Sequence, residues 1–194
     1  MTEHWLIGDQ AQLAAERILD SAGRCFASRG VFRASIGEIA HEAGCSRPTI
    51  YRYFSDRDAL RTAYMHREAR RLSQSVGEAI QGIRDPEQRL VGAVLVALQG
   101  VRANPALMAW FTGQDGASTT GLAGSSPVIA SLTEAFLGDA AEPERAERAR
   151  WLVRIMLSLL LLPGSNEREE RAMLKRFVVP VVSATSRSAT QRGV

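Results

Sequence analysis

The chain has 194 residues, of which 45% are hydrophobic and 23% are charged. This composition is typical of a folded globular protein and excludes intrinsically disordered and collagen-like chains. The formal net charge is +3, with Lys175 as the only lysine among 24 basic residues, and so small a charge permits nucleic-acid binding without requiring it.

Membrane, metal and disulfide classes have little support in the sequence. The most apolar stretch, Trp151 to Pro163, contains Arg154 and is shorter than the roughly 20 residues that span a bilayer. The first ten positions, Met1 to Gln10, lack the basic and apolar regions of a signal peptide. Cys25 and Cys45 stand apart from any metal-binding spacing. We therefore expect a cytoplasmic protein that needs no membrane, metal or cofactor.

Apolar residues recur at helical spacing almost throughout, which predicts an all-α fold of about nine helices. Residues 1–8 are expected to form a flexible N-terminal arm. The first helix is predicted from about Asp9 to Arg29, with Leu13 and Phe26 on its inner face, and Gly30 provides its stop signal.

Two short helices are predicted next. Ser35 and Glu38 have the spacing of a capping box, which starts the second helix, and Gly44 ends it. Ser46 is a natural N-cap for the third helix, where Pro48 is tolerated because first-turn amides have no partner within the helix.

A long helix is predicted to start at Ser55 and Asp58 and to end at the Asp85-Pro86 pair. A Gly, Ser and Thr-rich segment at 113–125 is expected to be a mobile loop, and residues 185–194 a frayed tail. The remaining helices are predicted at Pro86 to Ala103, Pro105 to Phe111, Ser126 to Leu137, Pro143 to Leu162 and Glu167 to Ala184.

Two short capped helices joined by a tight turn make a helix-turn-helix, whose second helix is the candidate reader of DNA. If Ile50 and Phe54 face inward, the outer arc of that helix carries arginines that can pair with guanine and tyrosines that can contact thymine methyls or phosphates. The arc consists of Arg47, Pro48, Thr49, Tyr51, Arg52 and Tyr53.

The run from Ala22 to Leu60 closely resembles the DNA-binding domain of the TetR (tetracycline repressor) family. The resemblance covers about the first third of the chain. It rests on Phe26, Gly30, Ile39-Ala40, Ala43-Gly44, Cys45-Ser46, the run Pro48 to Phe54 and the run Asp56 to Leu60. It implies a homodimeric bacterial regulator, usually a repressor, whose C-terminal domain binds a small molecule and then releases the operator.

The resemblance also implies roles for single residues. Phosphate contacts fall to Ser35 and Thr49, base contacts to Arg47 and Pro48, a base edge or phosphate to Tyr51, and the DNA backbone to Tyr53 and Arg57. Two positions depart from the family pattern, because Arg57 stands where lysine is usual and Gly37 where some relatives carry a base-reading arginine. Base readout is therefore expected to rest on Arg47, Tyr51 and Arg52.

Simpler roles remain open for several of these residues. Tyr51 or Tyr53 can be a half-buried core aromatic, and Arg52 can be an ordinary solvated arginine. Ser35 serves as a helix cap whether or not it also meets a phosphate.

The predicted helices at Pro143 to Leu162 and Glu167 to Ala184 carry wide apolar surfaces. We expect these surfaces to be buried in a dimer interface, and ordinary core packing is the alternative. Pro180 predicts a kink in the last helix. The interface candidates are Trp151, Ile155, Leu159, Leu162, Phe177 and Val181.

A ligand pocket is implied by the resemblance and only weakly indicated by residues, since methionine and aromatic side chains usually fill cores. Arg102 or Arg154 is a candidate polar anchor. The pocket candidates are Met108, Trp110, Phe111, Leu132 and Phe136.

Phosphate loops, zinc-protease motifs and nucleophile elbows are missing from the sequence, so an enzyme is not expected. We expect a DNA-binding domain at residues 9–71 and a ligand-binding and dimerisation domain at residues 72–184. The expected partners are double-stranded operator DNA, a second copy of the chain and a small-molecule ligand. An all-α carrier or enzyme on a similar scaffold is the alternative, and repressor and activator are not distinguished.

Overall fold

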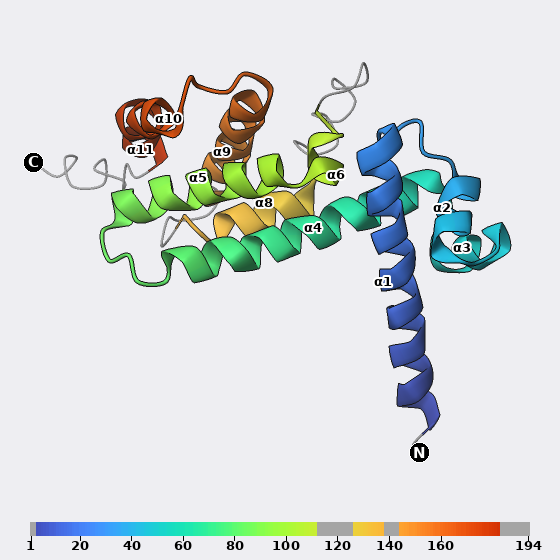
Figure 1. The fold of residues 1–194 in the computed structure, drawn as a ribbon. Helices are drawn as coiled ribbons and strands as arrows, with labels where there is room; N and C mark the ends of the chain where they lie inside the picture. Colours follow the sequence, from blue (N-terminus) through green and yellow to red (C-terminus); the bar gives the residue numbers. More distant parts are fainter. Residues whose placement is uncertain (1–2, 112–125, 138–143, 183–194) are drawn as a thin grey trace, which may run out of the picture. The chain divides into compact units, whose positions relative to one another are not determined.

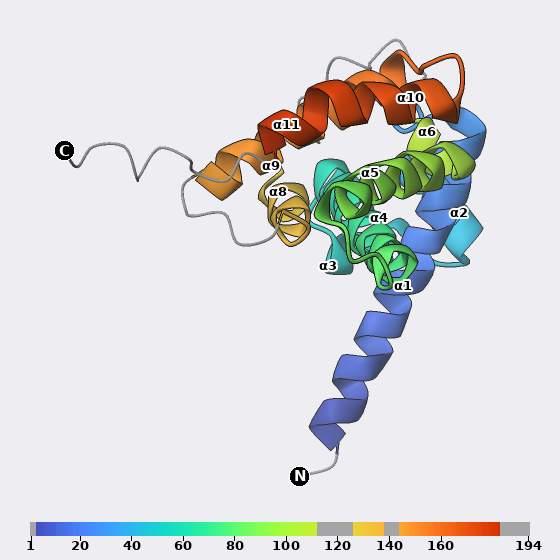
Figure 2. The same cartoon turned by 90° about the vertical axis from the view of Figure 1, so that its left-hand side faces the viewer.

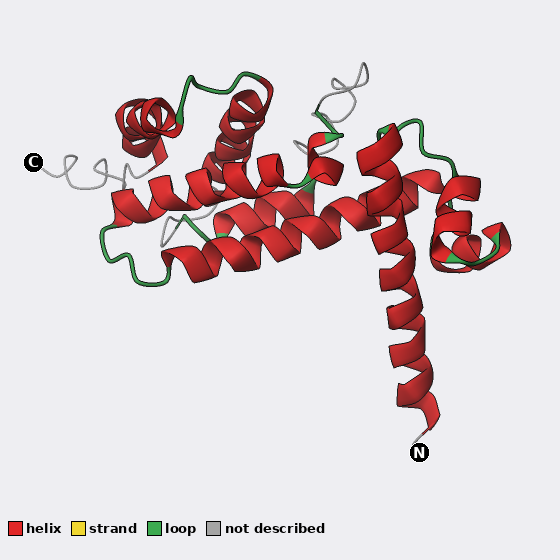
Figure 3. Cartoon of the chain, in the orientation of Figure 1, coloured by secondary structure: helices red, strands yellow, loops and turns green. Residues whose placement is uncertain are grey.

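The computed structural model describes residues 3–111, 126–137 and 144–182. Every regular element in these ranges is a helix, as Figure 3 shows, which confirms the all-α prediction. If the continuous stretch from Glu167 to Val182 is counted once, these ranges hold nine helices, as predicted. The elements labelled in Figure 1 are α1 (Glu3–Arg29), α2 (Ile36–Ala43), α3 (Arg47–Tyr53), α4 (Arg57–Ile80), α5 (Pro86–Ala103), α6 (Pro105–Met108), α8 (Pro127–Glu134), α9 (Glu144–Leu161), α10 (Glu167–Met173), the π-helical turn η1 (Leu174–Val178) and α11 (Val179–Val182).

The chain folds into two compact units. Of the described residues, 3–68 and 104–111 form the first unit, and the others form the second. Helix α6 packs against α1 and belongs to the first unit. The functional domains at 9–71 and 72–184 stay a prediction. Helix α4 is continuous through Glu68, where the first unit ends, and Ala69, where the second begins.

Local signals place the helix ends of the first unit where the sequence predicts them. Helix α1 is followed by Gly30 with φ of +86°, and α2 by Gly44 with φ of +66°, a left-handed backbone that glycine adopts without steric cost. Ser35 and Glu38 form the predicted capping box: the Glu38 carboxylate accepts from the Ser35 N–H at 2.8 Å, and the Ser35 hydroxyl accepts from the Glu38 N–H at 3.3 Å.

Apolar side chains from all helices of the first unit meet in one core. The ring of Phe26 lies edge-on to those of Tyr64 and Trp110, with centroids 5.2 and 6.2 Å away. Buried members of this core are Ile18, Phe26, Ile39, Ile50, Leu60, Tyr64 and Trp110. Helix α2 packs on α1, and α3 packs on α2, so these contacts hold the helix-turn-helix in place.

Helix α1 starts earlier than predicted. It begins at Glu3, so residues 3–8, expected in a flexible arm, are helical. Leu13, expected on the inner face, is exposed, because the rest of the unit buries side chains of α1 only from Ile18 onward.

The cap of α4 also differs from the prediction. Asp56, rather than Ser55, precedes the helix, and its carboxylate accepts from the Ala59 N–H at 2.7 Å. The Ser55 hydroxyl donates to the same carboxylate at 3.1 Å. This backbone hydrogen bond and the serine hydroxyl hold the pKa of Asp56 below its usual range.

The second unit is built around α5. Figures 1 and 2 show α5 beside the C-terminal half of α4, with α8 next to the pair. Helix α5 also contacts α9 and the continuous helix formed by α10, η1 and α11. Its core includes a cluster in which Val76 and Ile80 of α4 meet Ala93 and Ala97 of α5. Small residues on α5 let the two helices approach closely.

One ion pair ties three segments of the second unit together. The buried carboxylate of Glu170 on α10 accepts from both terminal nitrogens of Arg102 on α5, at 2.6 and 2.9 Å. It also accepts from the Gly164 N–H at 3.0 Å, while Arg102 donates to the Leu159 carbonyl at the end of α9 at 2.9 Å. The hydrogen bond with Arg102 holds the pKa of Glu170 below its usual range.

The helix that ends at Val182 is irregular in front of Pro180. The turn η1 is π-helical, and the Val179 N–H donates to the Leu174 carbonyl, five residues earlier. Proline removes a backbone donor and crowds the preceding turn, so an adjustment at this point is expected. The sequence predicts a kink at this proline, and the structure has a π-turn just before it.

Two predicted segments, the loop at 113–125 and the tail at 185–194, lie outside the described residues. Among the helices of the described ranges, none combines the length and the apolarity that crossing a membrane would take.

Candidate nucleic-acid interface

Helix α3 is held in place by its inner face. Ile50 and Phe54 are buried, as predicted, and the Ser46 hydroxyl caps the helix by accepting from the Thr49 N–H at 3.2 Å. Pro48 lies in the first turn, where its missing N–H leaves no helical bond unmade. A seven-residue helix is too short to be stable alone, so this burial fixes its orientation.

The outer arc of α3 faces solvent. Arg47, Pro48, Tyr51 and Arg52 are exposed, and half of the Tyr51 side chain is accessible (50%). A residue exposed to this extent is not part of the core of the unit. For Tyr51, the structure therefore disfavours the core-aromatic alternative.

Thr49 and Tyr53 are half-buried, and each already has a polar partner. The Thr49 and Ser46 hydroxyls share a hydrogen bond of 2.8 Å. The Arg52 guanidinium donates to the Tyr53 hydroxyl at 3.2 Å and lies 5.2 Å from the centre of its ring. Arg52 therefore lies along α3 over Tyr53, an arrangement that adjacent positions in the sequence do not predict.

Ser35 works as the helix cap that the sequence predicts. Its hydroxyl also donates to the Glu38 carboxylate at 2.8 Å, and Glu38 pairs with Arg29 at 2.9 Å. The backbone N–H and hydroxyl of Ser35 hold the pKa of Glu38 below its usual range. A phosphate at Ser35 would therefore meet a hydroxyl already engaged with a carboxylate.

Arg57, expected to hold the DNA backbone, is bonded inside the protein. Its guanidinium donates to the Phe32 carbonyl in the connection between α1 and α2. Arg61, one turn later, donates to the carbonyls of Val31 and Phe32 at 3.2 and 3.3 Å. Burial, and then the neighbouring charge of Arg61, lower the pKa of Arg57. The two arginines thus supply hydrogen-bond donors to carbonyls of the turn that follows α1.

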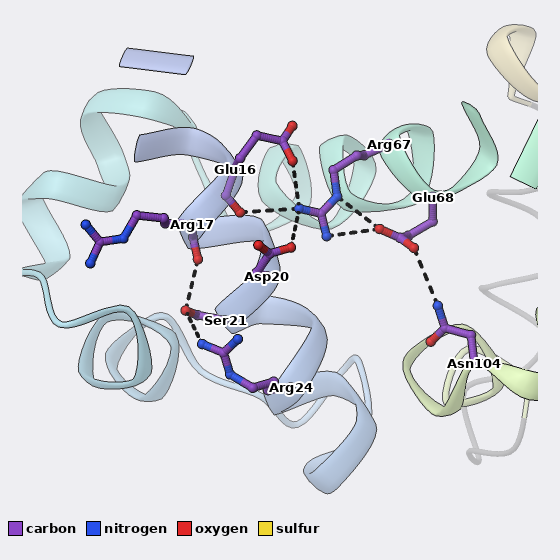
Figure 4. Close-up of polar contacts among 8 residues, drawn as sticks. All are labelled: Glu16, Arg17, Asp20, Ser21, Arg24, Arg67, Glu68 and Asn104. Carbon is purple, nitrogen blue, oxygen red and sulfur yellow. Dashed lines mark hydrogen bonds and ion pairs between the residues drawn. The ribbon is translucent and has the colours of Figure 1, made fainter. Parts of the chain in front are cut away.

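A further charged cluster, shown in Figure 4, joins α4 to α1. The buried Arg67 guanidinium donates to the carboxylates of Glu16 at 3.0 Å, Asp20 at 2.8 Å and Glu68 at 3.0 Å. Burial opposes the charge of Arg67, but the three carboxylates outweigh it and raise its pKa. Glu68 accepts in turn from the amide of Asn104, the cap of α6, at 3.4 Å. Sequence reasoning missed this cluster.

The predicted pocket residues fall in different units. Trp110 is buried in the first unit, with its ring centre 6.5 Å from that of Phe32, which matches the core-packing alternative. Met108 and Phe111 are half-buried in the same unit. Leu132 and Phe136 are half-buried in the second unit. A pocket lined by all five stays a prediction.

The predicted interface residues divide by exposure. Leu162, Phe177 and Val181 expose 77%, 60% and 52% of their surface, whereas Trp151 and Ile155 are half-buried. Leu159 is buried among the helices of its own unit and is therefore not available to a partner. The pattern that made Leu159 a candidate, an apolar helix on all sides, does not indicate which side is covered.

Comparisons with known proteins agree with this geometry. The profile of bacterial regulatory proteins of the tetR family matches residues 18–64, which cover α2, α3 and the adjoining parts of α1 and α4. The chain is 47% identical over 192 residues to the uncharacterized HTH-type transcriptional regulator MT1294 of Mycobacterium tuberculosis (strain CDC 1551 / Oshkosh), spanning 97% of this chain and 95% of that relative.

Solved structures share the fold at low sequence identity. The TetR family repressor AlkX from Dietzia sp. matches with a TM-score of 0.67 at 18% identity, over 88% of this chain and 96% of AlkX. RolR in complex with resorcinol matches with a TM-score of 0.67 at 16% identity, over 93% of this chain and 96% of RolR. The family profile matches the helix-turn-helix, and the relative MT1294 matches nearly the whole chain. The chain therefore belongs to the tetR family of bacterial regulatory proteins and is a helix-turn-helix transcriptional regulator.

Proposed function

We propose that this regulator is a homodimeric repressor that binds a palindromic operator through α3 and leaves it when a small apolar molecule binds the second unit. The observation that carries the proposal is the outer arc of α3, where Arg47, Tyr51 and Arg52 are exposed on a helix anchored by the buried Ile50. Arginine can pair with guanine O6 and N7, and a tyrosine ring can pack on a thymine methyl. The protein would act in the cytoplasm, where bacterial DNA lies.

Exposed apolar side chains support the dimer. Large apolar residues are rarely left in water on a monomer when several occur together. Leu161, Leu162, Met173, Phe177 and Val181 are all exposed, and all belong to the second unit. A second copy of the chain is the partner that would cover this surface symmetrically.

The ligand response is supported by the continuity of α4. This helix carries Arg57 and Arg67 in the first unit and Val76 and Ile80 in the core of the second. A ligand that favours one position of α4 would shift the spacing of the recognition helices, and only its differential affinity for the two positions sets the size of the shift. A small apolar ligand suits half-buried apolar residues such as Leu132 and Phe136. RolR, which shares this fold, was crystallised in complex with the ligand resorcinol.

Selection of the purified protein on randomised duplex DNA tests the proposal. We expect enrichment of a palindrome whose half-sites lie about 34 Å, or a multiple of one helical turn, apart. Tyr51→Ala is expected to weaken binding to the enriched duplex about tenfold or more. Tyr51→Phe keeps the ring and removes only the hydroxyl, so it shows how much of this loss comes from the hydroxyl. If no sequence is enriched, the proposed binding of a palindromic operator through α3 is wrong.

A further inference from the structure

Gly37, in the first turn of α2, leaves a space that Arg47 fills. A Cβ placed at residue 37 would lie 2.5 Å from Nη2, 2.9 Å from Nε and 3.0 Å from Cζ of Arg47. Real Cβ atoms essentially never approach other heavy atoms to under 3.0 Å. The guanidinium of Arg47 therefore lies directly on the backbone of α2, although Arg47 itself begins α3.

Backbone conformation does not explain the glycine. Within the described residues, Gly30 and Gly44 are the glycines with positive φ, and Gly37 is in ordinary helical geometry. Glycine is a poor helix former, and alanine would be preferred at such a position on helix propensity alone. What distinguishes Gly37 is the guanidinium above it.

Arg47 differs from its arginine neighbours in its partners. Arg24 pairs with Glu42 at 2.6 Å and Arg29 with Glu38 at 2.9 Å. In the described part of the chain, no hydrogen bond or ion pair involves the side chain of Arg47. Its guanidinium is thus held in place by shape while its donors remain available to a ligand.

We propose that Gly37 is a specificity-determining residue: by lacking a side chain it seats the Arg47 guanidinium on α2 and aims its donors at one guanine of the half-site. The inference rests on the proposed binding of operator DNA. A side chain at residue 37 would turn Arg47 away from that guanine. Gly37 therefore acts through Arg47 and is a positioning residue with no base contact of its own.

A displaced guanidinium has room to move. Arg47 borders an open groove of about 560 Å³ between α1 and α2, whose other walls include Arg24, Ser28 and His41. Since the clash involves the end of a flexible side chain, the side chain can move while the backbone stays in place. We therefore expect Gly37→Ala to fold normally and to unfold at an equal or higher temperature than the wild type.

The test is a double-mutant cycle on the duplex enriched by the wild-type protein. The four proteins are the wild type, Gly37→Ala, Arg47→Ala and the double variant. Gly77→Ala near the C-terminal end of α4 is the control, because a Cβ there meets nothing within 4 Å. We expect Gly37→Ala and Arg47→Ala each to weaken binding roughly tenfold, and the double variant to bind no more weakly than Arg47→Ala alone.

A change on the DNA provides a readout that does not depend on protein folding. Replacing the proposed guanine by 7-deazaguanine removes the N7 acceptor, which should weaken binding of the wild type and leave that of Gly37→Ala unchanged. If Gly37→Ala keeps the affinity and the sequence preference of the wild type, the inference is wrong. It is also wrong if adding Gly37→Ala to Arg47→Ala weakens binding as much as Gly37→Ala weakens it in the wild type. If the wild-type protein enriches no sequence, the proposed function fails, and this inference fails with it.

Discussion

The guanidinium of Arg57 has two possible partners. In the structure it donates to the Phe32 carbonyl, whereas the family resemblance places it on the DNA backbone. The two roles are compatible, because a guanidinium carries five donors and Arg57 remains partly exposed. Arg61 also donates to the Phe32 carbonyl at 3.3 Å, so this acceptor keeps a partner if Arg57 is lost.

Arg57→Ala is therefore expected to have two moderate effects. The free energy of unfolding should fall by about 1 kcal/mol, the usual contribution of one hydrogen bond. Duplex affinity should fall for every sequence alike, and the slope of log affinity against log salt should become shallower by about 1. Urea titration and salt-dependent binding measure the two effects. An unchanged salt slope would mean that Arg57 serves only the connection between α1 and α2.

Among the helices of the second unit, Arg102 and Glu170 form the contacts that connect α5 with α9 and α10. Removing one partner of a buried pair leaves the other charge without its compensation, which costs about 3 to 5 kcal/mol when both are fully buried. Here the Glu170 side chain is 2% exposed and that of Arg102 is 30% exposed. Water can therefore reach Arg102, and the expected cost is smaller.

We expect Glu170→Ala to lower the free energy of unfolding by about 2 kcal/mol at neutral pH. The pKa of Glu170 is lowered in the folded chain, so its contribution is present above the unfolded value of about 4.3 and is lost as the pH falls through the folded value. The difference in the free energy of unfolding between the wild type and Glu170→Ala should therefore shrink below about pH 4. Denaturant unfolding at several pH values measures it.

Glu167→Ala on the same helix is the control for this prediction. Glu167 is exposed, pairs with Arg171 at 2.6 Å and accepts from the Gln99 amide on α5 at 2.7 Å. Such exposed contacts contribute about 1 kcal/mol or less. If Glu170→Ala is no more destabilising than Glu167→Ala, the pair with Arg102 does not join these helices in the way the structure suggests.

The sequence predicts those features of each element that depend on near neighbours. Ser35 with Glu38, Gly44, Ser46 and the inward-facing Ile50 follow from spacings of a few residues, and the structure confirms each of them. The candidate DNA surface was therefore predictable, because it lies on one short capped helix.

Contacts between distant residues were not predictable from spacing. Arg67 meets Glu16 across 51 positions, and Arg102 meets Glu170 across 68. With so many arginines in the chain, no local rule selects which one is buried with which carboxylate. The exposure of Leu13 was missed for a related reason, since periodicity gives the face of a helix but not the length over which other helices cover it.

In the whole molecule, α4 is the helix that has residues in both units. The Arg67 cluster fixes the first half of α4 to α1 and to Asn104. The second half belongs to the core of the other unit through Val76 and Ile80. If the chain dimerises through the second units as proposed, α4 is the helix that links each recognition helix to the dimer.

Methylation protection of guanine N7 on the enriched duplex tests whether α3 reads the operator, because N7 lies in the major groove. If two copies of α3 read the operator, guanines should be protected at two symmetric positions about one helical turn, or a multiple of it, apart, and Arg47→Ala should expose one guanine in each half-site. A complex that forms while every guanine N7 stays reactive, or that protects a single asymmetric segment, would contradict the account.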